Sequence, residues 1–411
     1  MCFNSVQRVF FILFCASNII INVVVCDSFL TVTGTKLSLN NERVYLSGMN
    51  QAWVHYGADF GNGDYVKSRP TLIRNLDNIR KAGGNSMRIW LHVDGLSTPM
   101  FDANGYVTGL DKYIIDDLKD FLHEARIRNI IINIVLWNFA RAPSWRLHGL
   151  VYNSSKLESY IHNALRPMVL ALKDEPALGI WEIMNEPEGC VAIGRRSSNP
   201  CLDTTTLHVY DFADWTLSSI PLELLLVFAG RQISAIHTAD NKALVTIGAW
   251  TYKSVATSLG RRNFYSDHCL EGLTNDSQAH LDLYEIHTYD TLHVYLPHDP
   301  FVVESSMYNL DKPVIIGEFS SKRGGGMTSP TQFLWGYYHG YSGTWSWCAL
   351  DNDSASDNIT VQERGMHSLD GLNNQSAGGR VNFIVNHDIS IWDYLACALW
   401  TVFQFLWKCL G

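Results

Sequence analysis

Short apolar runs alternate with longer amphipathic stretches along most of the chain. The short runs are apolar on both of their alternating faces, which is typical of strands buried on both sides of a parallel sheet. They predict eight strands, at residues 45–50, 84–92, 129–137, 180–184, 243–248, 281–287, 314–317 and 343–347. The longer stretches predict helices, the clearest at residues 70–82, 110–126, 156–173 and 206–238. Strands that alternate with helices without a second domain predict an α/β fold, a single (β/α)8 TIM barrel.

The segment before the first barrel strand has a different pattern. Residues 29–39 and 42–46 predict two strands joined by a turn at Asn40-Asn41. We expect this short N-terminal β-hairpin to plug the closed end of the barrel. In the following helix, at residues 70–82, we expect Pro70 in the first turn, where proline is tolerated.

The first 26 residues predict a secretory signal peptide. Arg8 supplies the positive charge, residues 9–25 are apolar, and residues 24–26 suit a cleavage site. We expect cleavage near Cys26 and a secreted, extracellular protein, with a retained membrane anchor as the alternative.

The last 23 residues, 389–411, form a hydrophobic tail that does not fit the barrel. It is too short and too interrupted for a membrane-spanning helix. The tail could be an interfacial helix in contact with a membrane, a helix packed on the barrel, or a lipid-anchor signal. The barrel domain is therefore expected at residues 27–388.

Composition narrows the functional class. The 411 residues are 47% hydrophobic, which is enough for one large core. The net charge of −9 argues against nucleic acid as a partner, because nucleic acid favours basic surfaces. We expect a monomer.

Cysteines and sequons fit an exported chain. Cleavage of the signal leaves an even number of cysteines, Cys190, Cys201, Cys269, Cys348, Cys397 and Cys409. Such a set permits disulfides, and Cys190 and Cys201 are the favoured pair because they flank one loop. Five sequons are glycosylation candidates, at Asn153, Asn275, Asn352, Asn358 and Asn374. Cysteines and histidines lack the spacing of metal sites, so the sequence predicts no metal and no cofactor.

Two of the predicted strands lead to a glutamate. Residues 180–184 lead to Glu186, and residues 314–317 lead to Glu318. Pro187 has no N–H to donate to a sheet, so it leaves Glu186 at the strand exit. The exits of parallel barrel strands meet at one mouth, where such folds place their chemistry. Two carboxyls that face each other there suit hydrolysis of a glycosidic bond, one neutral and the other ionised.

Other side chains at the strand ends fit this pair. Arg88 needs an anion if it is buried, so we expect it to favour the ionised form of Glu318. Tyr289 is expected to donate to Glu318, and His287 to hydrogen-bond in the cleft and help set the proton balance. Asn185 is expected to donate to the sugar 2-hydroxyl.

An apolar wall is expected under the sugar ring. Trp345 and Trp347 share one face of the last strand by its period of two, so both are candidates for this wall.

The motifs WEIMNEP, HTY at residues 287–289, IIGEF and WSW, in this order and spacing, resemble glycoside hydrolase family 5 of the clan-A barrels. The similarity covers residues 29–386, and LTVTG…LSGMNQAW and GMHSLDGLNNQSAGGRVNF resemble invertebrate secreted endo-β-1,4-mannanases. The resemblance implies hydrolysis of mannan, galactomannan and glucomannan by a retaining double displacement. It implies Glu186 as acid/base and Glu318 as nucleophile. The family's supporting residues are matched by Arg88, Asn185, His287, Tyr289 and Trp345.

Four further residues lie at predicted strand exits, so we expect them to line the cleft. They are Trp53, His92, Trp137 and Trp250. Two alternatives remain open: an endo-β-1,4-glucanase with the same machinery, and a polysaccharide-binding protein without catalysis.

Overall fold

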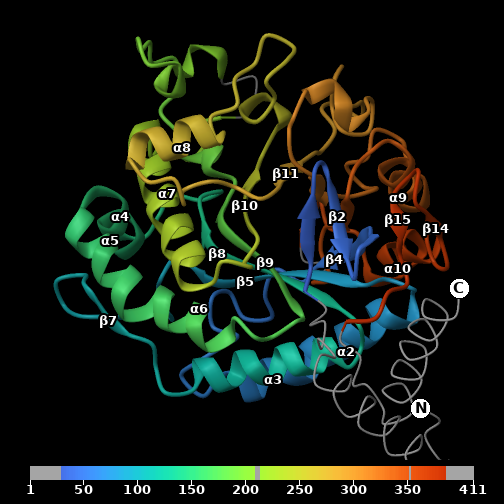
Figure 1. Ribbon diagram of the computed structural model, residues 1–411, viewed down its shortest axis with the longest axis horizontal. Coiled ribbons are helices and arrows are strands. Elements are labelled where there is room, and N and C mark those ends of the chain that lie inside the picture. The colour runs from blue at the N-terminus through green and yellow to red at the C-terminus, as the bar shows by residue number, and fades with distance from the viewer. Residues whose placement is uncertain (1–28, 209–212, 351–352, 386–411) are drawn as a thin grey trace, which may run out of the picture. The chain divides into compact units, whose positions relative to one another are not determined.

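The computed structural model describes residues 29–208, 213–350 and 353–385 (Figure 1). The predicted signal, the hydrophobic tail, Asn352, Cys397 and Cys409 lie outside these residues.

The centre of the fold is a closed barrel of parallel strands, joined in chain order. The strands are β4 (Leu46–Asn50), β5 (Ser86–Val93), β8 (Ile131–Asn138), β9 (Leu178–Asn185), β10 (Val245–Ala249), β11 (Tyr284–His287), β12 (Val314–Phe319) and β13 (Gly343–Ser346). The predicted barrel is confirmed, and each strand end lies within three residues of its expected place.

Helices surround the barrel, in the connections between strands and after the last strand (Figure 1). They are α2 (Tyr65–Lys81), α3 (Ile114–Arg126), α4 (Trp145–Tyr152), α5 (Ser154–Tyr160), α6 (Arg166–Leu172), α7 (Leu222–Ala239), α8 (Asp267–Thr274), α9 (Ser329–Tyr338) and α10 (Ile359–His367). The fully described connection from β11 to β12 instead holds only a 3₁₀ turn, Ser305–Tyr308.

Three helix predictions were wrong at their starts, the smallest error being at α3, which begins at Ile114 and not at residue 110. Helix α2 begins at Tyr65, so Pro70 lies inside the helix and not in its first turn. Helix α7 begins only at Leu222, directly after Pro221. The fixed φ of proline and its missing N–H suit the start of a helix, and the described residues directly before it, 213–220, belong to the preceding loop.

The N-terminal hairpin is confirmed as part of a three-stranded antiparallel sheet, β1 (Thr31–Thr33), β2 (Lys36–Leu39) and β3 (Glu42–Arg43). Asn40 and Asn41 both have positive φ, 54° and 63°, as a tight two-residue hairpin turn requires. Leu30 lies against Gly179 near the start of β9, so this segment covers the end of the barrel where the strands begin. Two small hairpins complete the described fold, β6 (Met100–Phe101) with β7 (Val107–Gly109), and β14 (Asn373–Asn374) with β15 (Gly379–Arg380).

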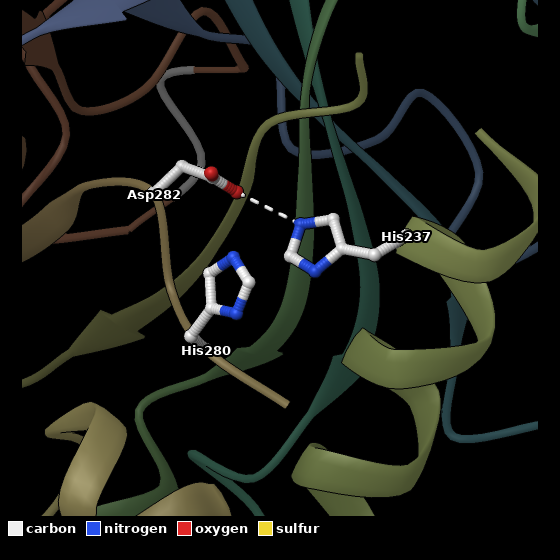
Figure 2. Close-up of side chains that lie close together, drawn as sticks. All are labelled: His237, His280 and Asp282. Atoms are coloured by element: carbon white, nitrogen blue, oxygen red, sulfur yellow. Dashed lines mark hydrogen bonds and ion pairs between the residues drawn. The ribbon is translucent and has the colours of Figure 1, made fainter. Parts of the chain in front are cut away.

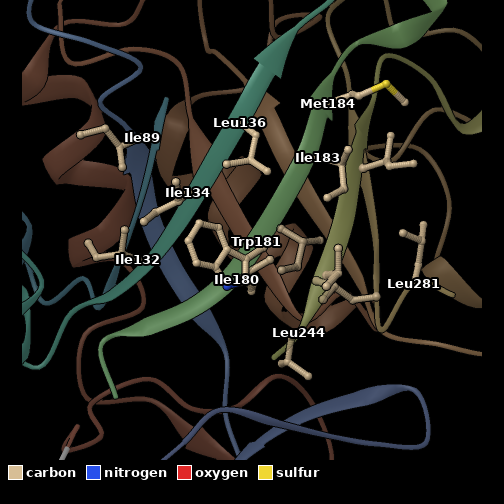
Figure 3. Close-up of a cluster of buried hydrophobic side chains, with 14 of the residues drawn as sticks. Ile89, Ile132, Ile134, Leu136, Ile180, Trp181, Ile183, Met184, Leu244 and Leu281 are labelled. Atoms are coloured by element: carbon tan, nitrogen blue, oxygen red, sulfur yellow. The ribbon is translucent and has the colours of Figure 1, made fainter. Parts of the chain in front are cut away.

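The main apolar core lies between the barrel and the helices. All eight residues of β8 are buried, and alternate side chains point to opposite faces. Ile132, Ile134 and Leu136 form an apolar row beside Trp181 of β9 (Figure 3). The side chain of Asn133 points to the opposite face and donates to the carboxylate of Glu182 on β9, inside the barrel. The interior of the barrel therefore admits polar groups, while the outer face of the strands supplies the apolar core.

The disulfide prediction was wrong in one partner. Cys201 is bonded to Cys269 of α8, 68 residues away, and Cys190 is a buried free thiol. Cys190 follows the end of β9 so closely that its sulfur is held against the end of β8, where it donates to the Phe139 carbonyl at 3.1 Å. Cys201 lies on the far part of the same loop and faces α8. Cys190 and Cys201 are therefore close in sequence but are not bonded to each other.

Replacing Cys201 with serine should lower the free energy of unfolding by about 3–4 kcal/mol, because the disulfide restricts a 68-residue loop in the unfolded chain. Thermal unfolding with and without reductant measures this. Wild type should lose stability in reductant, and Cys201→Ser should not respond to it. Cys190→Ser is the control and should still respond. A wild-type midpoint unchanged by complete reduction would contradict the prediction.

Candidate active site

Glu186 stands directly after β9 in a left-handed backbone conformation, with φ 49° and ψ 57°. A non-glycine residue in this region costs about 1–3 kcal/mol of backbone energy, and such residues cluster at functional sites. Pro187 then begins a 3₁₀ turn. The reversal of the chain at Glu186 ends the strand and leaves this residue only 6% exposed at the mouth of the barrel.

Glu318 lies near the end of β12, beside His287 on β11. Its two oxygens accept hydrogen bonds from different donors. Arg88 Nη1 donates to Oε1 at 2.6 Å, and the Tyr289 hydroxyl donates to Oε2 at 3.0 Å. Both predicted contacts of Glu318 are therefore confirmed.

The two carboxyls face each other across His287. One oxygen of Glu186, one oxygen of Glu318 and one ring nitrogen of His287 lie within 4.8 Å of one another. His287 Nδ1 is 2.8 Å from Glu186 Oε1 and 3.6 Å from Glu318 Oε2. The predicted pair thus forms one compact site at the mouth.

The surroundings separate the proton affinities of these groups. Burial, together with the charge of Glu318, raises the pKa of Glu186 well above its ordinary value. Burial also raises the pKa of Glu318, to about 7, but the hydrogen bonds from Arg88 and Tyr289 oppose that rise. Glu186 therefore holds its proton more tightly than Glu318. Burial lowers the pKa of His287 well below its ordinary value, as does the Arg88 charge, so the imidazole is neutral.

Arg88 organises the polar residues around the pair. Its Nη2 donates to Asn185 Oδ1 at 2.7 Å and its Nη1 to Asn50 Oδ1 at 2.9 Å. Asn185 in turn donates to Asn138 Oδ1 at 3.0 Å. Asn185 has a second amide N–H that can turn toward a ligand.

Sequence reasoning missed four residues in contact with this network, Asn50, Asn138, Glu182 and Glu285. The available signal was a polar residue inside a run that is otherwise apolar and buried on both faces. Such a side chain can point only into the barrel.

Aromatic side chains form two groups at the mouth. The first group comprises Trp53, Tyr56, Trp90 and Trp347, with ring centroids 5.0–6.2 Å apart. The second group comprises Trp215, Trp250 and Tyr289, with successive centroids 5.3 and 5.7 Å apart. Tyr289 also packs against the first group, so its ring joins the two. Trp215 is 38% exposed, and the second group therefore extends outward to the surface.

Three of the predicted cleft residues lie elsewhere. Trp345 precedes Trp347 by two residues and is fully buried deeper in the barrel. Its Nε1 donates to Ser86 Oγ at 2.9 Å. His92 and Trp137 are also fully buried.

The error at His92 and Trp137 has a physical cause. The pairing of β5 with β8 shifts register between Trp90 and Val93, so the alternation of faces breaks there. Beyond the shift, Trp137 donates to Gln232 of α7, outside the barrel, and the His92 ring packs against Trp137. Burial lowers the pKa of His92 to about 3, which fits a core histidine.

A second cluster of ligating side chains lies away from the mouth, formed by His237, His280 and Asp282 (Figure 2). Both ring nitrogens of His237 face oxygen atoms, Asp282 Oδ2 at 3.0 Å and the Gln278 carbonyl at 2.8 Å. Burial lowers the pKa of His237, but Asp282, the Gln278 carbonyl and Asp240 together outweigh burial and leave it raised. The His280 ring stacks on His237 at 4.6 Å and 25°, so the two rings do not aim at a common ion. The cluster is an ion pair between α7 and the segment before β11.

Comparison with known proteins gives relatives over most of the chain. A mannan endo-1,4-beta-mannosidase from Mytilus edulis is 44% identical over 328 residues, 79% of this chain and 89% of that protein. The enzyme of the same name from Cryptopygus antarcticus is 39% identical over 88% of this chain and 95% of its own. The crystal structure of an endo-1,4-beta-mannanase from Eisenia fetida matches with a TM-score of 0.85 and 45% identity, over 87% of this chain and 99% of that chain. No protein-family model matches the chain.

Proposed function

The chain belongs to the endo-1,4-β-mannanases and hydrolyses β-1,4-mannosidic bonds, and on this premise we propose that it does so with net retention of configuration. One observation carries the proposal: carboxyl oxygens of Glu186 and Glu318 lie within 4.8 Å of each other. Retaining glycosidases separate their carboxyls by about 5–5.5 Å, whereas inverting enzymes need about 6.5–9.5 Å to admit a water. Mannan, galactomannan and glucomannan are the proposed substrates.

The roles of the two carboxyls follow from their partners. Glu318 is the nucleophile, because Arg88 and Tyr289 stabilise its ionised form through two hydrogen bonds. Glu186 is the acid/base, because its partner is the neutral His287 instead of a cation, and because it holds its proton to higher pH.

The reaction proceeds in two displacements. Glu318 attacks the anomeric carbon while Glu186 gives its proton to the departing glycosidic oxygen, and a glycosyl ester forms on Glu318. Glu186, now a carboxylate, takes a proton from water, and the hydroxyl attacks the anomeric carbon. The ester bond breaks, Glu318 is free again, and Glu186 is protonated again.

A side-by-side assay tests the activity and the stereochemistry. Reducing-end release should be fast on galactomannan and glucomannan, slow on carboxymethylcellulose, and lost in Glu186→Ala and Glu318→Ala. Proton NMR of the first products should show the β-anomer before mutarotation. An initial α-anomer would overturn retention, and faster release from carboxymethylcellulose would overturn the mannan preference.

The pH profile should separate the two carboxyls. The kcat/KM should rise with pH as Glu318 loses its proton and fall as Glu186 loses its own, because each is needed in one form only. An activated aryl β-mannoside has a leaving group that needs no proton. With this substrate Glu186→Gln should keep the acidic limb and lose the basic limb. A basic limb that survives in the variant would assign that limb to another group.

The two aromatic groups are proposed to stack on successive sugar rings on either side of the carboxyl pair, through Trp53 and Trp347 in one group and Trp250 in the other. Trp250→Ala should lower kcat/KM for galactomannan about fivefold to tenfold, mainly through KM, because it removes a stacking face. The control is Tyr338→Ala, since Tyr338 is an exposed aromatic on α9. An unchanged KM in Trp250→Ala would remove this residue from the substrate path.

We also propose that the protein is secreted. The disulfide between Cys201 and Cys269 suits an oxidising compartment. The sequon residues Asn153, Asn275, Asn358 and Asn374 are all exposed. In the described residues no helix has the length and apolar character needed to cross a membrane. Expression in cultured cells, with the medium and the lysate assayed separately and digested with glycosidase, tests the proposal. Unglycosylated enzyme confined to the lysate would overturn it.

A further inference from the structure

The guanidinium of Arg88 is shared by three carboxyls, that of Glu318 and those of Glu182 and Glu285 deeper in the barrel. Arg88 donates to Glu182 from Nε at 2.7 Å and from Nη2 at 2.6 Å, and to Glu318 from Nη1. Glu285 Oε1 lies 3.0 Å from Arg88 Nε. Arg88, Glu182 and Glu285 are each 0% exposed. Three ionised carboxyls around one cation would leave two excess negative charges without solvent, so we expect at least one of the three to hold a proton.

The hydrogen-bond donors identify which carboxyl is neutral. Glu182 accepts three hydrogen bonds, two from Arg88 and one from Asn133 at 2.9 Å. Glu318 accepts two, from Arg88 and Tyr289. Glu285 Oε2 accepts only a long bond of 3.4 Å from Asn133, and its Oε1 has no hydrogen-bond partner in the described part of the chain. Donors stabilise a carboxylate, so the carboxyl with the fewest donors is the one that keeps its proton. Burial raises the pKa of Glu285 in the same direction, as does the charge of Glu182.

Glycines on the neighbouring strands fix the positions of these carboxyls. A Cβ at Gly317, the residue before Glu318, would collide with the carboxyl of Glu285. A Cβ at Gly248 would likewise collide with the carboxyl of Glu182. Each carboxyl therefore fills space that the neighbouring strand leaves open, and the Glu285 carboxyl lies against β12 at the residue before Glu318.

His287 connects Glu285 to the acid/base. The two residues are two positions apart on β11, so their side chains share the inner face. His287 Nε2 lies 3.5 Å from Glu285 Oε1, and among the described residues neither atom has a hydrogen-bond partner. A shared proton would satisfy two buried polar atoms that otherwise cost free energy. The other ring nitrogen, Nδ1, lies 2.8 Å from Glu186 Oε1.

We propose that Glu285 is a protonated positioning residue that donates a hydrogen bond to His287 Nε2, so that His287 Nδ1–H donates to Glu186 Oε1. The tautomer of a neutral imidazole is set by the partner of its other nitrogen. With Nδ1–H directed at Oε1, the proton of Glu186 is held on Oε2 and is free to move to the glycosidic oxygen. In the opposite tautomer Nδ1 would accept that proton and hold it away from the substrate. The proposal rests on the role of Glu186 given above.

Two variants of similar shape test the donor. Glu285→Gln keeps a neutral group with an N–H for His287, and Glu285→Met fills the space without a donor. Glu285→Met should lower kcat/KM for galactomannan on the order of tenfold or more, and Glu285→Gln should restore most of that loss. Equal losses in the two variants would reduce Glu285 to a packing role and overturn the proposal.

The pH profile of Glu285→Gln tests the charge. Glu285 is faced by Arg88, Glu182, His287 and Glu318. Replacing one neutral group by another should leave the acidic limb in place. If Glu285 were ionised, its removal would lower the pKa of Glu318 and shift the acidic limb to lower pH, which would contradict the proposal.

Nitrogen NMR on histidine-labelled enzyme reads the tautomer directly. The His287 signals are identified by their absence from a His287→Gln sample. We expect a neutral ring with its proton on Nδ1 in wild type and in Glu285→Gln, and a loss of that preference in Glu285→Met. A proton on Nε2 in wild type would overturn the proposal. This measurement does not depend on catalysis, so an error in the role of Glu186 would instead appear in the aryl-mannoside pH profile.

Discussion

Glu318→Gln is expected to lower kcat on galactomannan by about four orders of magnitude or more, because the variant has no nucleophile to form the glycosyl ester. Folding should be unaffected. The glutamine oxygen can accept from Arg88, and the amide N–H can donate to the Tyr289 hydroxyl, which can also act as an acceptor. Steady-state kinetics and thermal unfolding of the same preparation measure both effects.

Added azide distinguishes the two carboxyls. In Glu318→Ala, azide can enter the space of the missing carboxyl and attack the sugar directly, which gives the α-mannosyl azide. In Glu186→Ala, azide attacks the ester already formed on Glu318, which gives the β-mannosyl azide. An activated aryl mannoside serves as the substrate in both cases. Products of the opposite configuration would exchange the two roles, and a folded Glu318→Gln with near wild-type turnover would remove Glu318 from catalysis.

Arg88→Met should lower the free energy of unfolding by about 3–5 kcal/mol, because it leaves buried carboxyls without their cation. The loss should shrink as pH falls. Without Arg88 the folded-state pKa values of Glu285 and Glu318 would be raised further, so the folded variant gains stability below the unfolded-state pKa and loses it as pH rises. Denaturant unfolding at acidic and at neutral pH measures this difference.

Arg69→Met is the matched control. Arg69 also pairs with two carboxylates, Asp120 and Glu124, but its side chain is 39% exposed. Its removal should cost no more than about 1 kcal/mol, because water screens and solvates the charges left behind. Equal losses in the two arginine variants would mean that burial does not decide the strength of the Arg88 cluster.

The sequence was sufficient to predict the barrel and the position of Glu186 and Glu318 close together at its mouth. An apolar run that leads to Glu186 or Glu318 predicts both a buried strand and the residue at its exit. Such a pattern spans only a few residues, so it can be recognised from the local sequence. Arg88, His287 and Tyr289 were also placed correctly, because a polar side chain in a buried run must find a partner inside the barrel. These inferences needed only the period of the strand and the rule that parallel exits meet at one mouth.

The rest depended on geometry that the chain does not display locally. The alternation of side chains between the two faces of a strand breaks where strand pairing shifts register. For this reason it gave the wrong face for His92 and Trp137. Trp345 lies deeper in the barrel than Trp347, although the strand period of two assigns both side chains to the same face. The disulfide partner of Cys201 lies on another strand connection, so no spacing within one loop could identify it.

The close fit of Glu285 against Gly317, and of Glu182 against Gly248, has an evolutionary consequence. A side chain cannot be introduced at either glycine while the facing glutamate keeps its place. Conversely, loss of either glutamate leaves a cavity beneath the Glu186–Glu318 pair that a larger neighbour could fill. Each glycine and its glutamate are therefore epistatic, and a lineage can change one only after, or together with, the other. Two such pairs beneath one active site would restrict the order in which descendants of this enzyme can acquire new chemistry.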